Sequence, residues 1–108
     1  MLFRSYWKFD VLFNVGLTEN HLPELQLGVP FPNPVRQFAF VSVSTDILSE
    51  ISLQLIDLLG RPVKTFYSGS IERGEQFLTL EVRGIPAGSY FLEMKNKDRV
   101  FTQKLLVR

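Results

Sequence analysis

QFLTLEVRGIPAGSYFLEMKN, residues 76–96, consists of two runs of alternating side chains on either side of a turn. Apolar residues fill every second position of both runs: Leu78, Leu80 and Val82, then Tyr90, Leu92 and Met94. Since successive side chains of a strand point to opposite faces, each run predicts a strand with one apolar face. The segment 85–88, IPAG, has proline second and glycine fourth, which favours a type I turn between the two strands.

The same period-two pattern covers most of the chain after Gln37, in short segments separated by glycine, proline, asparagine and aspartate. Further strands are predicted at 38–44, 51–57, 62–67 and 99–107, with a polar loop at 68–75. Gly60 can take the positive φ angle that closes a short hairpin. Helical periodicity is nearly absent, so the apolar faces of the strands must cover each other. The sequence therefore predicts an all-β fold, an antiparallel β-sandwich.

The segment VPFPNPVR, residues 29–36, contains three prolines within six residues, which excludes a helix and an inner strand. We interpret it as a stiff junction between a linker and a compact domain. Residues 1–28 are predicted to be an N-terminal linker or the tail of an upstream cargo region, and residues 29–108 the β-sandwich. Within the first part, residues 7–17 are interpreted as an isolated strand that belongs to something upstream.

The start of the sequence superficially resembles a signal peptide, since Arg4 and Lys8 precede an apolar stretch. Asp10 and Asn14 interrupt that stretch, and no small-residue cleavage pattern follows. We therefore expect no export signal in this stretch.

The composition limits the class of protein. A chain of 108 residues, 45% hydrophobic and 21% charged, is typical of one globular domain. The formal charge of +1 gives no broad field that would attract nucleic acid or an anionic membrane. Without cysteine, no disulfide framework, thiolate zinc site or cysteine nucleophile can form. No apolar window reaches the roughly 20 residues that a transmembrane segment requires.

Residues suited to catalysis are few. His21, the only histidine, lies in the predicted linker and lacks a rigid frame for metal binding or acid–base chemistry. The acidic residues fall on predicted turns or polar strand faces, without a pair spaced for acid–base catalysis: Asp57, Glu72, Glu75, Glu81 and Glu93. No nucleophile elbow or phosphate loop occurs, because the glycines lie in turns between strands. We therefore predict neither enzymatic activity nor a cofactor or metal site.

Two surface patterns could bind a partner. The C-terminal run is basic, with Asp98 as its single acid: Lys95, Lys97, Arg99, Lys104 and Arg108. It could form a docking stripe, but on charge alone a protected edge strand is the simpler interpretation. Phe77, Phe91 and Tyr67 could face outward as a sugar-stacking platform, although such aromatic residues more often belong to the core or to inter-strand pairs.

Four blocks of sequence occur in a distinctive order: PFPNPV at 30–35, LIDLLGRPVKT at 55–65, RGEQFLTLEVRGIPAGSYFLEMK at 73–95 and VFTQKLLVR at 100–108. In this combination, residues 29–108 closely resemble the C-terminal sorting domain of the type IX, or Por, secretion system, type A. The resemblance implies an immunoglobulin-like β-sandwich of about seven short strands, which agrees with the strand pattern.

The resemblance also implies a passive delivery signal for an attached N-terminal cargo. The domain would be recognised in the periplasm by shuttle proteins and the outer-membrane translocon, so that the cargo reaches the cell surface or is secreted. A sortase would then cut the domain off as its substrate and attach the cargo to lipopolysaccharide. Members of the family need a signal peptide and a cargo domain upstream. We find neither here, which favours a fragment of a larger protein or a start placed too late.

The resemblance assigns the sorting motif to Pro32, Asn33, Pro34, Gly60, Gly88, Tyr90, Lys104, Leu105 and Val107. It implies glycines at unusual φ angles, a tyrosine at a corner and an exposed lysine near the end of the last strand. The basic final hairpin is our candidate docking surface, and cleavage is expected within 15–28, in extended and unpacked backbone. The alternative is an immunoglobulin-like structural or adhesive module, similar to the sandwich domains of flagellar hook-capping proteins, which share the N-P turn and the D-L-L-G-R hairpin.

Overall fold

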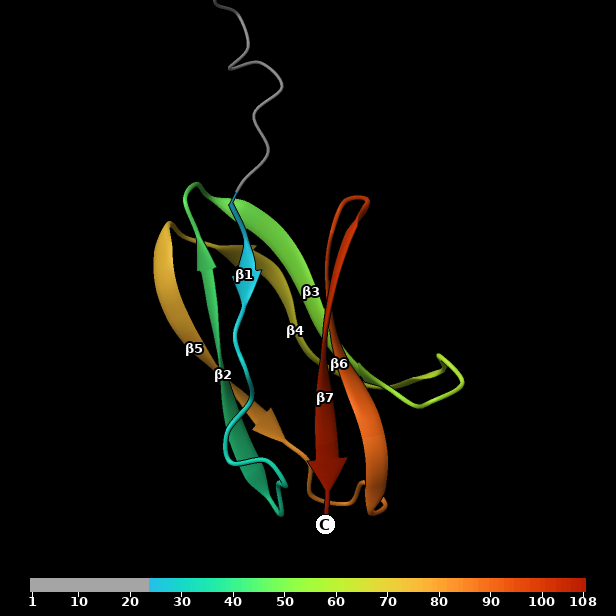
Figure 1. The fold of residues 1–108 in the computed structure, drawn as a ribbon. Coiled ribbons are helices and arrows are strands. Elements are labelled where there is room, and N and C mark those ends of the chain that lie inside the picture. The colour runs from blue at the N-terminus through green and yellow to red at the C-terminus, as the bar shows by residue number, and fades with distance from the viewer. Residues whose placement is uncertain (1–23) are drawn as a thin grey trace, which may run out of the picture.

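The computed structural model describes residues 24–108, and in this range every regular element is a strand. The strands are β1 (Gln26–Leu27), β2 (Phe38–Thr45), β3 (Ser49–Ile56), β4 (Pro62–Ile71), β5 (Gly74–Glu81), β6 (Gly88–Asn96) and β7 (Arg99–Val107). They form two antiparallel sheets, with the orders β1-β2-β5 and β4-β3-β6-β7. The two sheets pack face to face (Figure 1), and the predicted all-β sandwich is confirmed.

The core lies between the sheets and follows the predicted alternation. In β3, Ile51, Leu53 and Leu55 are buried, whereas the residues between them are partly exposed. Leu53 lies opposite Met94 of β6 and Leu55 lies opposite Leu92, and all four side chains are inaccessible to solvent. Burial of a side chain of this size contributes roughly 1.5–3 kcal/mol. These cross-strand pairs therefore fix the register of the larger sheet as well as its inner face.

Two predicted loops differ from the structure. The loop expected at 68–75 is reduced to the two residues between Ile71 and Gly74, because β4 continues past Gly69 and ends with the buried Ile71. The turn expected at 85–88 lies instead at 82–85, where the N–H of Ile85 donates to the carbonyl of Val82 at 3.0 Å. Gly84, at φ +84°, supplies the positive angle at the third position of that turn. The chain then crosses from β5 in one sheet to β6 in the other.

The packed part of the chain begins upstream of Val29. Leu25 is buried, and β1 pairs with β2 through Gln26 and Ser44 and through Leu27 and Val43. Residues 24–28, which we predicted as linker, therefore cover one edge of β2. His21 and the predicted strand at 7–17 lie outside the described residues.

Two possible features are not found in the part of the chain that the structure describes. Residues 24–108 contain no helix that is long and apolar enough to span a membrane. The same residues contain no group of histidine, aspartate and glutamate side chains that could hold a metal ion.

Candidate functional site

Asn33 joins the proline-rich segment to the last strand. Its Nδ2 donates to the carbonyl of Lys104 at 3.2 Å, and its Oδ1 accepts from the N–H of Leu106 at 3.0 Å. The side-chain amide has the same donor and acceptor as a peptide group, so it replaces a neighbouring strand at this point of β7. Two residues on, the N–H of Val35 donates to the carbonyl of Leu106, and the N–H of Arg108 donates to Val35, both at 2.8 Å. We call residues 31–35 the proline clip.

The proline clip connects both sheets of the sandwich. Phe31 exchanges two backbone hydrogen bonds with Phe40 of β2, at 2.9 and 2.8 Å, and Val35 is fully buried beside β7. Pro32 and Pro34 follow cis peptide bonds and alternate with the residues that form hydrogen bonds. Since proline has no N–H to donate, the two prolines occupy positions at which the clip forms no backbone hydrogen bond. The segment predicted as a junction is therefore part of the folded domain and bridges β2 of one sheet and β7 of the other.

Gly60 closes the hairpin between β3 and β4, as the sequence predicts. Its φ angle is +84°, and its N–H donates to the carbonyl of Asp57 at 2.9 Å. The Asp57 carboxylate accepts from the N–H groups of Leu59 and Arg61 and from Nε of Arg61, each at 2.9 Å. The backbone hydrogen bond from Arg61, followed by its side-chain hydrogen bond, holds the pKa of Asp57 below its usual value. The hydrogen bonds of the Asp57 carboxylate therefore stabilise this turn from within.

Gly88 and Tyr90 define the corner at the start of β6. Gly88 has a φ of +156°, and the ring of Tyr90 lies 3.8 Å from the position that a Cβ on Gly88 would take. The Tyr90 hydroxyl donates to the carbonyl of Pro86 at 2.6 Å, and the side chain is 9% exposed. The tyrosine therefore ties the crossing between the sheets to the first residues of β6.

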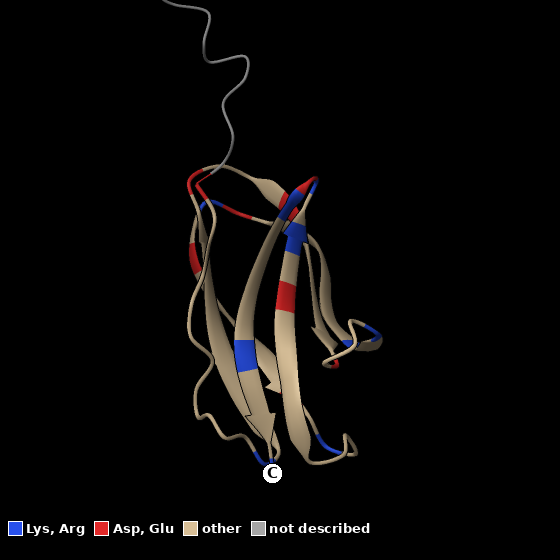
Figure 2. Cartoon of the chain, turned by 45° about the vertical axis from the view of Figure 1, so that its right-hand side comes forward, with Lys and Arg blue, Asp and Glu red and all other residues tan. Residues whose placement is uncertain are grey.

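The last strand presents Lys104 to solvent next to the buried Leu105. Leu105 and Val107 are almost fully buried, whereas Lys104 and Leu106 are exposed. Figure 2 shows basic residues at the β6–β7 turn and, separately, one basic residue farther down β7, with an acidic residue between them on the hairpin. Lys95 is 3.7 Å from Glu93. The basic residues of this run therefore do not form one continuous stripe.

A protein-family model matches most of the chain. The model of the family described as the secretion system C-terminal sorting domain matches residues 30–108. The chain belongs to this family. It thus carries a C-terminal sorting signal of type IX secretion, which directs export toward the cell surface or the medium. No curated protein matches the chain.

Most of the predicted motif residues of the sorting domain meet at one end of the β6–β7 hairpin. Gly88 lies opposite Val107, and Tyr90 lies opposite Leu105. Asn33 is bonded to the backbone on either side of Leu105, and the flanking residues Pro32 and Pro34 come with it. Gly60 is the exception, since it lies in the separate β3–β4 hairpin. Apart from Gly60, the predicted motif residues therefore lie around one end of the β6–β7 hairpin, where the proline clip is bonded to it.

The sorting domain also contains contacts that sequence reasoning missed. Gln103 Nε2 donates to the carbonyl of Leu27 at 3.0 Å, which ties β7 to β1 of the other sheet. The amide of Asn96 donates to the carbonyl of Glu50 at 2.7 Å. No local pattern announces either bond, because each partner is brought close only by the folded sheets. A depression beside Asn96 is lined by residues 47–52, 68–69 and 95–97, and its charged lining residues are Glu50, Lys95 and Lys97.

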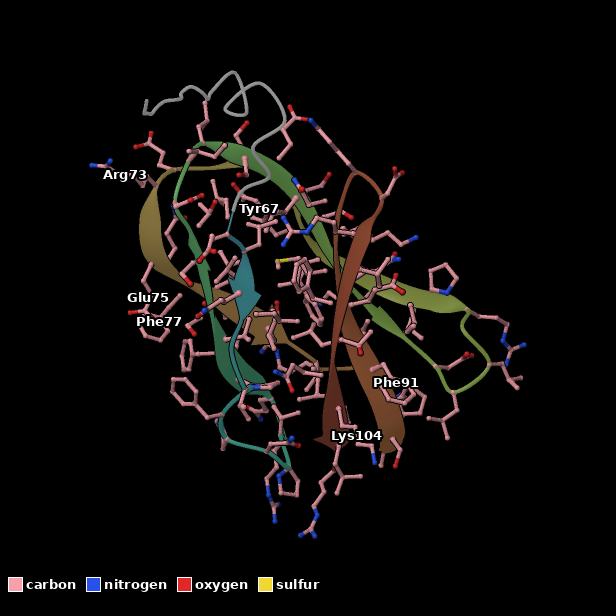
Figure 3. The ribbon with its side chains drawn as sticks, turned by 45° about the horizontal axis from the view of Figure 1, so that its top comes forward. Tyr67, Arg73, Glu75, Phe77, Phe91 and Lys104 are labelled. Carbon is pink, nitrogen blue, oxygen red and sulfur yellow. The ribbon has the colours of Figure 1, made fainter. Side chains whose placement is uncertain are left out.

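The aromatic residues considered as a sugar platform do not come together. Phe77 lies on β5, in the other sheet from Tyr67 and Phe91, and Figure 3 shows it on the opposite side of the molecule from Phe91. Tyr67 is half-buried, and its hydroxyl donates to the carbonyl of Ser70. Instead, Phe77 is 6.2 Å from the ring of Phe31, which is itself 6.1 Å from Phe40. The sequence signal for this cluster of phenylalanine rings was the presence of phenylalanine at outward positions of β2.

Proposed function

We propose that this sorting domain is the removable address of an attached cargo and that the β6–β7 hairpin is the part recognised by the outer-membrane translocon and its shuttle proteins. In this proposal a sortase later cuts the domain off and joins the cargo to the cell surface. The domain is the substrate of that reaction and performs no chemistry itself. The family match favours this role over that of a structural or adhesive module.

The observation that carries the proposal is the meeting of the motif residues at the clasped end of the hairpin. The outward row of β7 consists of Val100, Thr102, Lys104 and Leu106, all exposed. The bonds of Asn33 and Val35 hold the backbone of this row from the open side of β7. A row that is already ordered loses little conformational entropy when a partner binds it.

Lys104 is the charged residue of this row. It faces Phe91 across the hairpin, and it forms no ion pair with the described residues. An exposed ammonium beside apolar side chains suits a partner surface with a carboxylate next to an apolar patch. We therefore assign Lys104 the role of the recognised charge.

The test is export of a fluorescent reporter that carries its own signal peptide and ends in residues 17–108, in a host with a type IX system. We expect Lys104→Ala to reduce the exported fraction and Lys104→Arg, which retains the charge, to restore most of it. Arg73→Ala is the matched control, because Arg73 is also an exposed basic residue but lies at the β4–β5 turn. Normal export of Lys104→Ala would exclude Lys104 as the recognised residue.

We propose further that the sortase cuts upstream of Leu25. Residues 15–28 were predicted to contain the site, but Leu25 is buried and β1 is paired with β2, so a protease would have to pull them off the sandwich. Mass spectrometry of the released cargo measures this directly. A cargo that ends before Leu25 supports the proposal, and a cut after Pro34 contradicts it.

A further inference from the structure

Four strands form the edges of the two sheets, and they differ in how well they are protected. The proline clip is bonded to the C-terminal end of the β7 edge, at Lys104, Leu106 and Arg108, and β1 is only two residues long. β4 begins with Pro62 and has two register shifts against β3. Proline, bulges and short length are the usual devices that prevent edge strands from pairing with another chain. β5 has none of them, since it pairs with β2 in an unbroken register from Gly74 to Glu81.

The backbone of β5 directs a set of hydrogen-bonding groups away from the sheet. In β2, Phe40 and Ser42 direct their backbone groups toward β1, through their bonds with Phe31 and Gly28. Their partners across the sheet, Thr79 and Phe77, therefore form non-hydrogen-bonded pairs with β2. It follows that Phe77 and Thr79, and Glu75 by the same alternation, point their N–H and C=O groups to the open side. No strand lies there among the described residues.

The outward side chains along this edge are apolar at the centre and charged at the ends. Phe77 is 60% exposed and packs edge-on against the ring of Phe31. Glu75 lies on one side of it, and Arg73 lies beyond Glu75 (Figure 3). On the other side is Glu81, whose pKa is lowered by the hydrogen bond from Arg83, so it is ionised at neutral pH.

We propose that two copies of this chain associate by antiparallel pairing of β5 with β5, with the two-fold axis at Phe77. In this register Phe77 lies opposite Phe77 of the second copy, and Glu75 lies opposite Thr79 of the second copy. Arg73 of each copy falls opposite Glu81 of the other. The free N–H and C=O groups are then paired, and each charge meets a neutral or an opposite partner.

Two other registers of the same pairing are less favourable. With the axis at Glu75, the Glu75 carboxylates of the two copies lie opposite each other. With the axis at Leu78, Glu75 lies opposite Glu81 of the second copy. Like charges directly opposite each other destabilise a strand pair, so the charges along β5 favour the axis at Phe77 over these two registers. This inference concerns a different edge from the proposed docking row on β7 and does not depend on it.

The dimer is expected to be weak, because a contact along one strand edge is smaller than a standard interface of about 1,600 Å². We expect a dissociation constant on the order of 0.1 mM, so the dimer forms only at high protein concentration. Sedimentation equilibrium of the 108-residue chain measures it over a concentration series. The average mass is expected to rise from one chain toward two, and a constant monomer mass overturns the proposal.

Two variants test the edge pairing, and the second, Thr79→Pro, distinguishes it from packing of the exposed phenylalanine side chains against each other. Phe77→Lys brings two ammonium groups together at the axis and should leave the chain monomeric. Thr79→Pro removes an N–H that faces the open side but none that bonds to β2, so it should also abolish the dimer. Leu59→Lys is the matched control, since Leu59 is 77% exposed in the β3–β4 turn, and should change nothing. Persistence of the dimer in Thr79→Pro overturns the edge contact.

Hydrogen exchange of the unmodified chain provides a test that does not depend on any variant folding. The amide protons of Phe77 and Thr79 should become several-fold slower to exchange as the protein concentration rises through the dissociation constant. The amide proton of Leu106, which is bonded within one chain, should not change. An increase in mass without slower exchange at Phe77 and Thr79 contradicts the proposal.

Discussion

Replacement of Asn33 by alanine removes the side chain that fastens the proline clip to β7. The variant loses one bond to the carbonyl of Lys104 and one from the N–H of Leu106. A hydrogen bond contributes roughly 0.5–1.5 kcal/mol net, and both backbone groups here can turn to water, which favours the lower half of that range. We therefore expect a loss of about 1–2 kcal/mol in the free energy of unfolding. For a domain of this size, that lowers the melting temperature by roughly 4–16 °C.

The assay combines thermal or denaturant unfolding with hydrogen exchange of single amides. Exchange of the Leu106 amide should become about tenfold faster in Asn33→Ala, since about 1.4 kcal/mol corresponds to a factor of ten. Asn33→Asp retains the acceptor for Leu106 but turns a carboxylate oxygen toward the carbonyl of Lys104, so it should be less stable than the unmodified chain. Arg36→Ala, an exposed change just beyond the clip, serves as the control. The reasoning is refuted if Leu106 exchanges at the same rate in Asn33→Ala as in the unmodified chain.

Three further predictions concern the two turns. Tyr90→Phe should lower the unfolding free energy by about 1 kcal/mol, because the carbonyl of Pro86 loses its donor, and equal denaturation midpoints would contradict this. Gly60→Val should lower the unfolding free energy by about 1–2 kcal/mol, because valine is strained at the positive φ angle of this position, and Gly60→Asn should lower it less. Equal losses for the two variants in urea unfolding would contradict this reason. The lowered pKa of Asp57 means that its stabilisation is complete above the unfolded-state pKa of about 3.9 and is lost as the pH falls through the folded-state pKa. NMR titration of the Asp57 carboxyl group measures the folded-state pKa, and a value at or above the ordinary one would exclude this stabilisation. Asp57→Asn should lose less stability in acid than the unmodified chain.

The sequence predicted the strands and their faces, but not how the strands divide between the sheets. Alternation in β3 places Ile51, Leu53 and Leu55 inside, since a strand has only two faces. The same alternation holds in β5 and β6, which are only a few residues apart along the chain but belong to different sheets. Periodicity reports which face is buried and carries no information on the neighbour of a strand. For that reason, the crossing between β5 and β6 became apparent only in the structure.

The candidate site was predicted in its residues but not in its arrangement. Asn33 and Lys104 came from the family resemblance, which gave no reason for them to be adjacent. The structure supplies the reason, since the side-chain amide of Asn33 bonds to the backbone of β7 on both sides of Leu105. Such a contact depends on the complete fold, so no local sequence signal announces it. The open edge of β5 likewise could not be predicted from the sequence, because an edge strand can be identified only when the order of strands in the sheet is known.

Export of the reporter fused to residues 17–108 is the most direct test of the account, if it is compared between a host with a complete type IX system and the same host without the translocon. Fluorescence should leave the periplasm in the first host and stay there in the second. Fluorescence retained in both hosts, although the fused domain is folded, would contradict the claim that this clasped β-sandwich is a sufficient address.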